Sequence, residues 1–125
     1  MPSGTQIRVF AEIDSTNAEA LRALGSGYAG PCWFMAASQN AGRGRLGRKW
    51  ISDIGNLYAS LLLPLGCATE VIPQLSFVAA LGVHDAVSQM MGADGKCTRL
   101  ALKWPNDVLL NAQKLAGILL ETSWQ

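Results

Sequence analysis

CWFMAASQNAGRGRLGRKW, residues 32–50, decides the prediction of the fold. Its first six residues, Cys32 to Ala37, are continuously apolar and follow a Gly-Pro turn, which is typical of a buried strand. Ser38 and Gln39 then lead directly into a segment rich in glycine and arginine. A buried strand that ends in polar residues beside a loop is the usual layout of a ligand site in α/β proteins. The sequence therefore predicts a site here, with Gln39 as a positioned hydrogen-bonding group.

The loop itself, residues 41–50, holds three of the 13 glycines and four of the 10 basic residues of the chain. Glycine allows backbone N–H groups to come close to a ligand, and arginine presents a planar fork of donors that fits carboxylate or phosphate. These properties predict a flexible anion-binding loop. Two other interpretations stay open for the loop alone, because such tracts also bind RNA and many basic runs are solvated surface.

The composition indicates one packed domain. A chain of 125 residues is long enough for one hydrophobic core, and 50% hydrophobic with 15% charged residues excludes a disordered protein. The formal net charge is only +1, so no global charge attracts nucleic acid. Positive charge is instead concentrated in the loop, and a local cluster favours a site over a long polyanion track.

The three cysteines, Cys32, Cys67 and Cys97, are widely spaced, with no C-x-x-C pair and no neighbouring histidine. They are predicted to be free, mostly buried thiols of a reducing compartment. The N-terminus lacks the basic start and apolar run of a secretory signal, and we expect no apolar stretch of the roughly 20 residues that span a bilayer. A cytoplasmic protein without membrane contact is predicted.

The elements around residues 32–50 alternate between strands and helices. Two-residue alternation predicts a strand over Ile7–Ile13, and apolar residues closed by a proline predict another over Leu57–Leu63. Apolar residues at steps of three and four predict a helix from about Val71 to Met91, which contains the single histidine, His84. No partner pattern marks this histidine as a catalytic base. The order predicts an α/β (α+β) fold with a mixed sheet flanked by helices.

Another helix is predicted to open at Ser15-Thr16-Asn17 and to close near Gly25 or Gly27. Thr16 and Glu19 have the spacing of a capping box, which explains the hydroxyls structurally. A helix N-terminus also offers unpaired N–H groups to polar ligands, so a binding role stays open beside the capping role.

The last third of the chain is predicted to hold a strand over Arg99–Lys103 and a hairpin with arms 108–110 and 114–120. Between them, Lys103-Trp104-Pro105-Asn106-Asp107 is either a rigid turn or a device that projects Asn106 and Asp107 beside Lys103. Lys114 at the head of an apolar strand has two interpretations, a snorkelling side chain or a site residue. Gly117 suggests that a ligand or a backbone approaches closely.

Several of these segments, each ambiguous alone, occur in one order. This order resembles the catalytic domain of biotin protein ligases from about Ile7 to Glu121, and the joint match is specific. The segments are Ser15-Thr16-Asn17, Gln39, GRGRLGR followed by Lys49-Trp50, KWPND from Lys103 to Asp107, and KLAGIL from Lys114 to Leu119.

The resemblance implies a mixed sheet flanked by helices, related to class II aminoacyl-tRNA synthetases and lipoate ligases. It implies ATP with Mg²⁺ and biotin as substrates of a two-step reaction. The carboxylate of biotin attacks the α-phosphate to give biotinyl-5′-AMP and pyrophosphate. A lysine of the biotin carboxyl carrier domain of a carboxylase then displaces AMP.

The resemblance also implies roles for individual residues. Arg45 and Lys114 would be catalytic, and Asp107 would serve Mg²⁺ indirectly. The residues implied at biotin are Ser15, Thr16, Asn17, Gln39, Arg43, Gly44, Arg45, Lys114 and Gly117. Those implied at ATP are Arg45, Arg48, Trp50, Asn106, Asp107 and Lys114. Cationic side chains suit a reaction that joins two anions, and a carboxylate nucleophile needs no general base.

We further expect residues 1–125 to form part of the catalytic domain. The family continues beyond it with more of this domain and a small β-barrel, and no DNA-binding domain or DNA partner is expected. A homodimer stays open. The alternatives are a lipoate ligase-like enzyme that forms an acyl-adenylate, and a non-catalytic fragment that binds nucleotide or nucleic acid.

Overall fold

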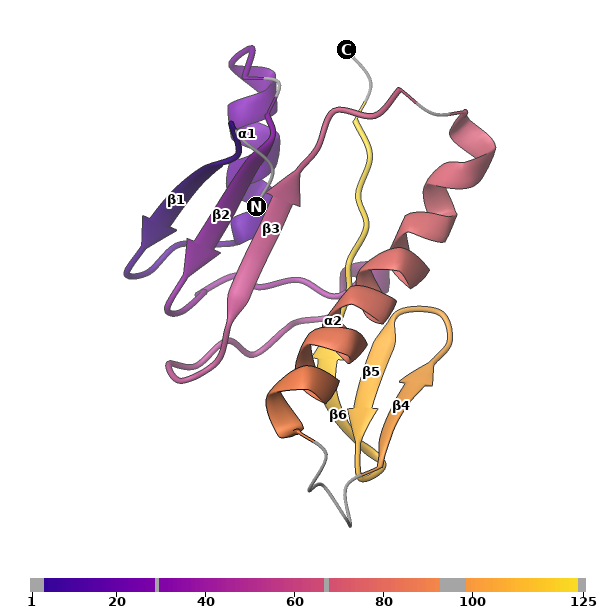
Figure 1. Ribbon diagram of the computed structural model, residues 1–125. Helices are drawn as coiled ribbons and strands as arrows, with labels where there is room; N and C mark the ends of the chain where they lie inside the picture. The colour runs from indigo at the N-terminus through magenta and orange to yellow at the C-terminus, as the bar shows by residue number, and fades with distance from the viewer. Residues whose placement is uncertain (1–3, 29, 67, 93–98, 124–125) are drawn as a thin grey trace. The chain divides into compact units, whose positions relative to one another are not determined.

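The computed structural model describes residues 4–28, 30–66, 68–92 and 99–123 (Figure 1). The chain divides into two compact units. The first comprises Met1–Gly66 with Ser123–Gln125, and the second comprises Cys67–Thr122. Each unit combines a three-stranded sheet with one α-helix.

The first unit contains a mixed sheet in the order β1 (Gln6–Phe10), β2 (Cys32–Ala36) and β3 (Tyr58–Leu62). β2 runs parallel to β1 and antiparallel to β3. The predicted strands at 32–37 and 57–63 are thus confirmed with slightly shorter bounds. The first strand ends earlier than predicted, and Ile13 is joined only by a single bridge to Gln39.

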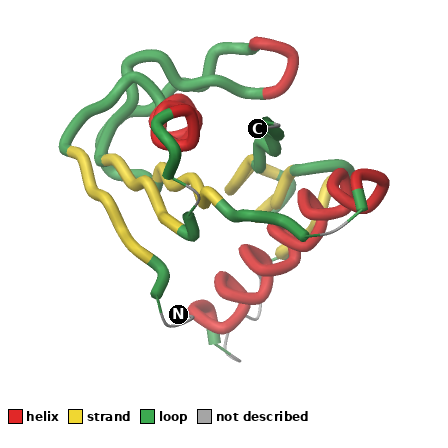
Figure 2. Tube along the Cα trace, turned by 90° about the horizontal axis from the view of Figure 1, so that it is seen from above, coloured by secondary structure: helices red, strands yellow, loops and turns green. Residues whose placement is uncertain are grey.

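Helix α1 (Thr16–Gly25) packs against this sheet, and Figure 2 views it nearly along its axis above the strands. The core between them consists of Ala20 and Ala23 from the helix and Cys32 and Phe34 from β2. Two alanines on one helical face allow a close approach to the sheet, where Phe34 is completely buried. Cys32 is a free, buried thiol as predicted, whereas Cys67 and Cys97 lie outside the described residues.

The start of α1 differs from the predicted capping box. The N-cap is Ser15, one residue before Thr16, and its hydroxyl accepts a hydrogen bond from the backbone of Ala18 at 3.3 Å. The Glu19 carboxylate bonds Arg22 at 2.8 Å. The Thr16 side chain therefore does not cap the helix. It contacts Gln39 and Ser60 instead.

The second unit contains α2 (Leu75–Met91), preceded by the 3₁₀ turn η2 (Thr69–Gln74). The predicted helix start at Val71 is wrong because Pro73 lies in the 3₁₀ turn and the α-helix begins only after it. α2 packs on an antiparallel sheet in the order β4 (Leu100–Lys103), β5 (Asp107–Leu110) and β6 (Gln113–Gly117). Val108 is completely buried in this unit.

The hairpin between β5 and β6 is confirmed with a shorter loop than predicted. Asn111 and Ala112 have φ angles of 51° and 65°, the pair of positive values that a two-residue type I′ turn requires. β6 therefore starts at Gln113 and ends at Gly117, before the predicted Leu120. The mixed α/β class is confirmed, although the strands form two sheets.

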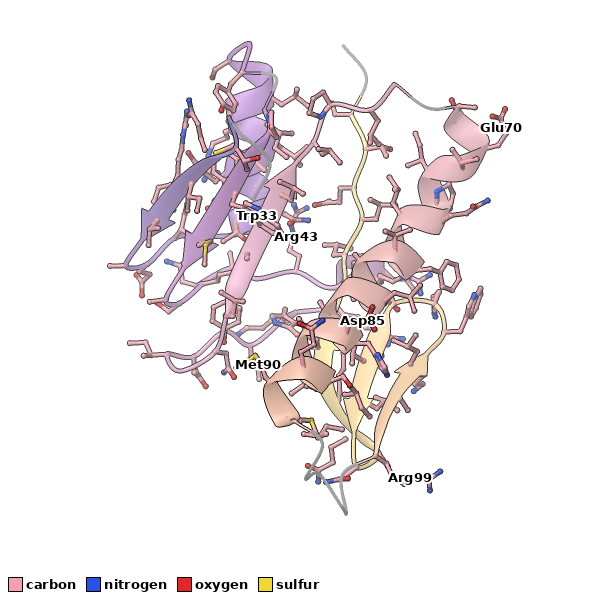
Figure 3. The ribbon with its side chains drawn as sticks, viewed as in Figure 1. Trp33, Arg43, Glu70, Asp85, Met90 and Arg99 are labelled. Atoms are coloured by element: carbon pink, nitrogen blue, oxygen red, sulfur yellow. The ribbon has the colours of Figure 1, made fainter. Side chains whose placement is uncertain are left out.

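One stretch corrects the expectation about apolar length. Thr69–Met91 has 23 residues, and its most apolar 18-residue window has a mean hydropathy of 1.3, which by length and composition would suffice to cross a membrane. Only 11% of its most apolar window is buried, and Met90 projects from the last turn (Figure 3). A single helix of this kind is weak evidence for a membrane protein, because core helices of soluble proteins share these properties.

Candidate functional site

The N-terminus of α1 carries a network of buried polar groups that joins three predicted site residues. The backbone N–H of Thr16 donates to Gln39 Oε1 at 2.8 Å, and the Thr16 hydroxyl oxygen lies 3.1 Å from the same atom. The Thr16 and Ser60 hydroxyls lie 2.8 Å apart, and Ser60 in turn donates to Asn17 Oδ1. Thr16 and Ser60 are 4% and 9% exposed, and Asn17 and Gln39 are partly buried.

Ser15 lies at the same helix terminus and is hydrogen-bonded to the Asp14 carboxylate, which forms an ion pair with Arg22. Its backbone N–H donates to Asp14 Oδ1 at 2.7 Å, and Arg22 holds both carboxylate oxygens of Asp14 at 2.8 Å. The hydrogen bonds from Arg22, followed by that from Ser15, lower the pKa of Asp14 from 3.8 to about 2. This ion pair fixes the residue that precedes the helix and with it the direction of α1.

The glycine- and arginine-rich loop forms a narrow hairpin. Trp50 N–H donates to the Gly42 carbonyl at 2.9 Å, and Gly44 N–H donates to the Arg48 carbonyl at 2.7 Å. Between these two contacts, the backbones of Arg43 and Lys49 form an antiparallel β-bridge. The tip is the 3₁₀ turn η1 (Arg45–Gly47). The side chains of its basic residues, Arg43, Arg45, Arg48 and Lys49, are exposed.

Gly42 at the base of this hairpin has a steric reason to be glycine. A Cβ there would lie 2.6 Å from the Trp50 carbonyl oxygen, 2.7 Å from Ser52 Oγ and 3.0 Å from Gln39 Nε2. These distances are too short for any side chain. At Gly44 the nearest contact would be 3.6 Å, which is ordinary packing. The hairpin base is therefore pressed against Gln39.

Two members of the network were missed by sequence reasoning. Ser60 is 9% exposed on the inward side of β3, and Ser52 is 5% exposed beyond the hairpin. The Ser52 hydroxyl accepts from Gln39 Nε2 at 3.0 Å and donates to the Trp50 carbonyl at 3.1 Å. A serine inside the otherwise apolar run YASLLL was the only available signal for Ser60.

The second unit holds the other predicted site residues. Lys114 Nζ lies 2.8 Å from Asp107 Oδ1, and the lysine side chain is 41% exposed. The contact is an ion pair by distance, although its angles are not those of a hydrogen bond. Asn106 fastens the chain after β6, because its backbone and side chain bond the backbone of Ile118 at 2.9 and 2.8 Å. Gly117 pairs with Asp107 across the sheet.

An apolar pocket of about 200 Å³ lies in the second unit between α2 and the Trp104-Pro105 turn. Phe77, Ala80 and Leu81 line it from the helix, and the Phe77 ring lies 6.4 Å from that of Trp104. Such a pocket is smaller than most sites for drug-sized ligands. Trp104 is 76% exposed, so the turn presents a large apolar surface.

The described residues do not form a metal site by themselves. They contain no group of three or more His, Cys, Asp or Glu side chains able to hold an ion. Asp107, the residue predicted to serve Mg²⁺, has an ammonium group as its neighbour. A magnesium ion would accordingly need ligands beyond these side chains, such as phosphate oxygens.

Comparison with known proteins assigns the chain to a family. Residues 9–124 match the Biotin/lipoate A/B protein ligase family. The chain is 53% identical over 116 residues to the biotin--[acetyl-CoA-carboxylase] ligase of Paracoccus denitrificans, covering 92% of this chain and 46% of the relative. It is 41% identical over 119 residues to the bifunctional ligase/repressor BirA of Escherichia coli, covering 94% of this chain and 35% of BirA.

Solved structures agree with this match. The biotin protein ligase of Leishmania major in complex with biotinyl-5-AMP superposes with a TM-score of 0.79 at 31% identity, covering 98% of this chain and 53% of that chain. The biotin protein ligase of Aquifex aeolicus in complex with biotin and ATP gives 0.75 at 34% identity, covering 94% and 47%. The chain thus spans about half the length of the relatives it matches, or less.

Proposed function

The chain belongs to the biotin/lipoate A/B protein ligase family, and we propose that it acts as a biotin protein ligase. Biotin and ATP would react to give biotinyl-5′-AMP and pyrophosphate, and the biotinyl group would pass to a lysine of a biotin carboxyl carrier domain. The observation that carries this proposal is the partly buried network of Thr16, Asn17 and Gln39 beside a hairpin that exposes three arginines.

The neutral network suits the recognition of biotin. Biotin's ring system is uncharged and offers N–H donors and a carbonyl acceptor. Such groups are matched by hydroxyl and amide side chains that are already fixed, since prior ordering lowers the entropy cost of binding. Ser15 lies at the same helix terminus. The backbone of Arg43 and Gly44 would complete this side of the site. We also assign contacts with biotin to Lys114 and Gly117.

The basic residues suit the adenylation step. A carboxylate oxygen of biotin forms a bond to the α-phosphorus while the bond to the β-phosphate oxygen breaks, and pyrophosphate leaves. Both reactants are anions, so cations that stay charged throughout stabilise the developing charge. We assign this role to Arg45 and Lys114, and assign contacts with ATP to Arg48, Trp50, Asn106 and Asp107. No general base is needed, because the carboxylate is already ionised.

The proposal extends to the surroundings of the reaction. Mg²⁺ would enter with the nucleotide phosphates, and the protein would work in the cytoplasm. The acceptor would be the carrier domain of a biotin-dependent carboxylase. Residues 1–125 would contribute one part of the catalytic domain, and a homodimer remains compatible with this arrangement.

Biotin-dependent ATP–pyrophosphate exchange tests the proposal. The assay is carried out on the chain and on a version extended beyond Gln125 by the matching segment of a relative. We expect ATP–pyrophosphate exchange that requires biotin. Lipoate serves as the control substrate. Exchange with lipoate and none with biotin in both proteins would contradict the proposal and favour a lipoate ligase. Salt-sensitive binding of nucleic acid that is indifferent to biotin would favour a binding module.

A further inference from the structure

We propose that Ser52 is a positioning residue that fixes the orientation of the Gln39 side-chain amide, and through it the ligand-binding end of α1. The geometry of this arrangement is independent of the ligand. Only the identification of that ligand as biotin rests on the proposed function.

The hydrogen-bond partners of the Gln39 side-chain amide allow only one orientation of this amide. The Ser52 hydroxyl has a single proton, and it donates this proton to the Trp50 carbonyl at 3.1 Å. It must therefore accept from Gln39, so the –NH₂ end of the amide faces Ser52 at 3.0 Å. The opposite end, Oε1, then faces the backbone N–H of Thr16 at 2.8 Å. A backbone N–H can only donate, so both ends of the amide require the same orientation.

Ser52 is itself held in a fixed position, which allows it to orient the Gln39 amide. Ser52 is 5% exposed, and its backbone carbonyl also accepts from the Gln39 N–H at 3.2 Å. Gly42 leaves no room for a Cβ between Ser52, Gln39 and Trp50. The hydroxyl is thereby held in place from the hairpin base. Ser52 links that base to the first turn of α1 through a single amide.

Removing the hydroxyl has a defined consequence. In Ser52→Ala the –NH₂ end of Gln39 loses its acceptor, so only the Thr16 end still favours the observed orientation and the amide flips more often. When it flips, –NH₂ meets the Thr16 N–H, so two donors face each other and the Thr16 N–H lacks an acceptor. The Glu19 N–H donates to the Ser15 carbonyl at 3.0 Å in the same helical turn and does not depend on Gln39.

Amide hydrogen exchange measured by NMR tests the inference without any ligand. We expect Ser52→Ala to lower the protection of the Thr16 amide about tenfold, the effect of losing one hydrogen bond, while Glu19 stays unchanged. Ser38→Ala is the matched control, because this serine neighbours Gln39 and its hydroxyl donates to the Ala11 carbonyl at 3.4 Å. Unchanged protection at Thr16, or an equal loss at Thr16 and Glu19, would overturn the inference.

Biotin affinity, measured by isothermal titration calorimetry, supplies the second readout. We expect Ser52→Ala to weaken binding about tenfold, and to add nothing when Gln39→Ala is already present. Losses that simply add in the double variant would overturn the inference, since Ser52 would then act independently of Gln39. If the unsubstituted chain binds no biotin, the proposed function fails. The amide hydrogen exchange experiment needs no ligand and still decides the role of Ser52.

Discussion

The two units of the molecule present polar groups in opposite ways. In the first, buried hydroxyls and a partly buried amide are bonded to one another around Thr16 and Gln39. In the second, the polar feature is a partly exposed ion pair, Lys114 with Asp107, on a sheet whose helix leaves large apolar side chains exposed. Buried neutral groups need fixed partners and so select a ligand by shape and hydrogen bonding. Exposed charges contribute little to folding and remain available for anions.

The hairpin of the first unit combines both behaviours. Its base is tightly packed at Gly42, whereas its arginine side chains reach solvent. Its tip is thus expected to matter for chemistry and its base for folding. This division is tested by comparing substitutions at the tip with substitutions at the base, and substitutions of charged residues with substitutions of neutral ones.

The largest effect is expected from Arg45→Ala. Biotin-dependent pyrophosphate exchange should fall by about 100-fold or more, as is typical when a group that stabilises transition-state charge is removed. The melting temperature should stay unchanged because the side chain is exposed. Lys49→Ala is the matched control, since this exposed cation of the same hairpin has no assigned role. A large loss of thermal stability in Arg45→Ala would indicate a structural role instead.

Gly42→Ala should have the next largest effect, on folding. The added Cβ would collide with the Trp50 carbonyl and Ser52, and such overpacking costs about 1–3 kcal/mol in the free energy of unfolding. Urea unfolding of Gly44→Ala provides the comparison, because a Cβ there makes only ordinary contacts. Equal stability of both variants would show that the hairpin base is not tightly packed.

Asp107→Asn should change chemistry more than folding. Lys114 loses its anionic neighbour and is held less well, so we expect pyrophosphate exchange to fall about tenfold and the free energy of unfolding to change by less than about 1 kcal/mol. Asp85→Asn is the control, since that exposed carboxylate lies 3.2 Å from His84 and has no assigned role. Destabilisation by several kcal/mol in Asp107→Asn would mean that the second unit depends on its charges for folding.

The smallest effect concerns Asp14 and pH. Its folded-state pKa of about 2 lies below the ordinary value of 3.8, so the ionised carboxylate favours the folded state. This contribution is fully present above about pH 4 and is lost as the pH falls through 2. We expect the melting temperature of the unsubstituted chain to exceed that of Asp14→Asn at pH 5 and to approach it at pH 2. A difference that is constant with pH would contradict the role of the Arg22 pair.

Local patterns in the sequence predicted much of the fold. Strand β2 followed from an apolar run, and helix α1 followed from a capping signal at its start and glycines near its end. Interactions between distant segments were not predictable in this way. The Thr16 side chain contacts Gln39 and Ser60, which lie 23 and 44 residues away in the sequence. No local pattern indicated that the strands would form two separate sheets.

The candidate site shows the same limit. Thr16, Asn17 and Gln39 were identified because they belong to family motifs, and the structure brings them together. Ser52 and Ser60 were missed, since a serine gives no periodic signal and its partners lie 13 and 44 residues away. Asp107 lies beside Lys103 as expected, since the two residues pair across β4 and β5. The contact of its carboxylate with Lys114, which the two-residue turn at Asn111 brings into range, was not predicted.

The central claim is that the neutral network of the first unit binds biotin. Titration of the ¹⁵N-labelled chain with biotin, followed by NMR, tests it most directly. We predict that biotin shifts the backbone amides of Thr16 and Asn17 and the side-chain amide of Gln39, and that Gln39→Ala weakens these shifts. Resonances of Thr16, Asn17 and Gln39 that stay unchanged at millimolar biotin would contradict the account.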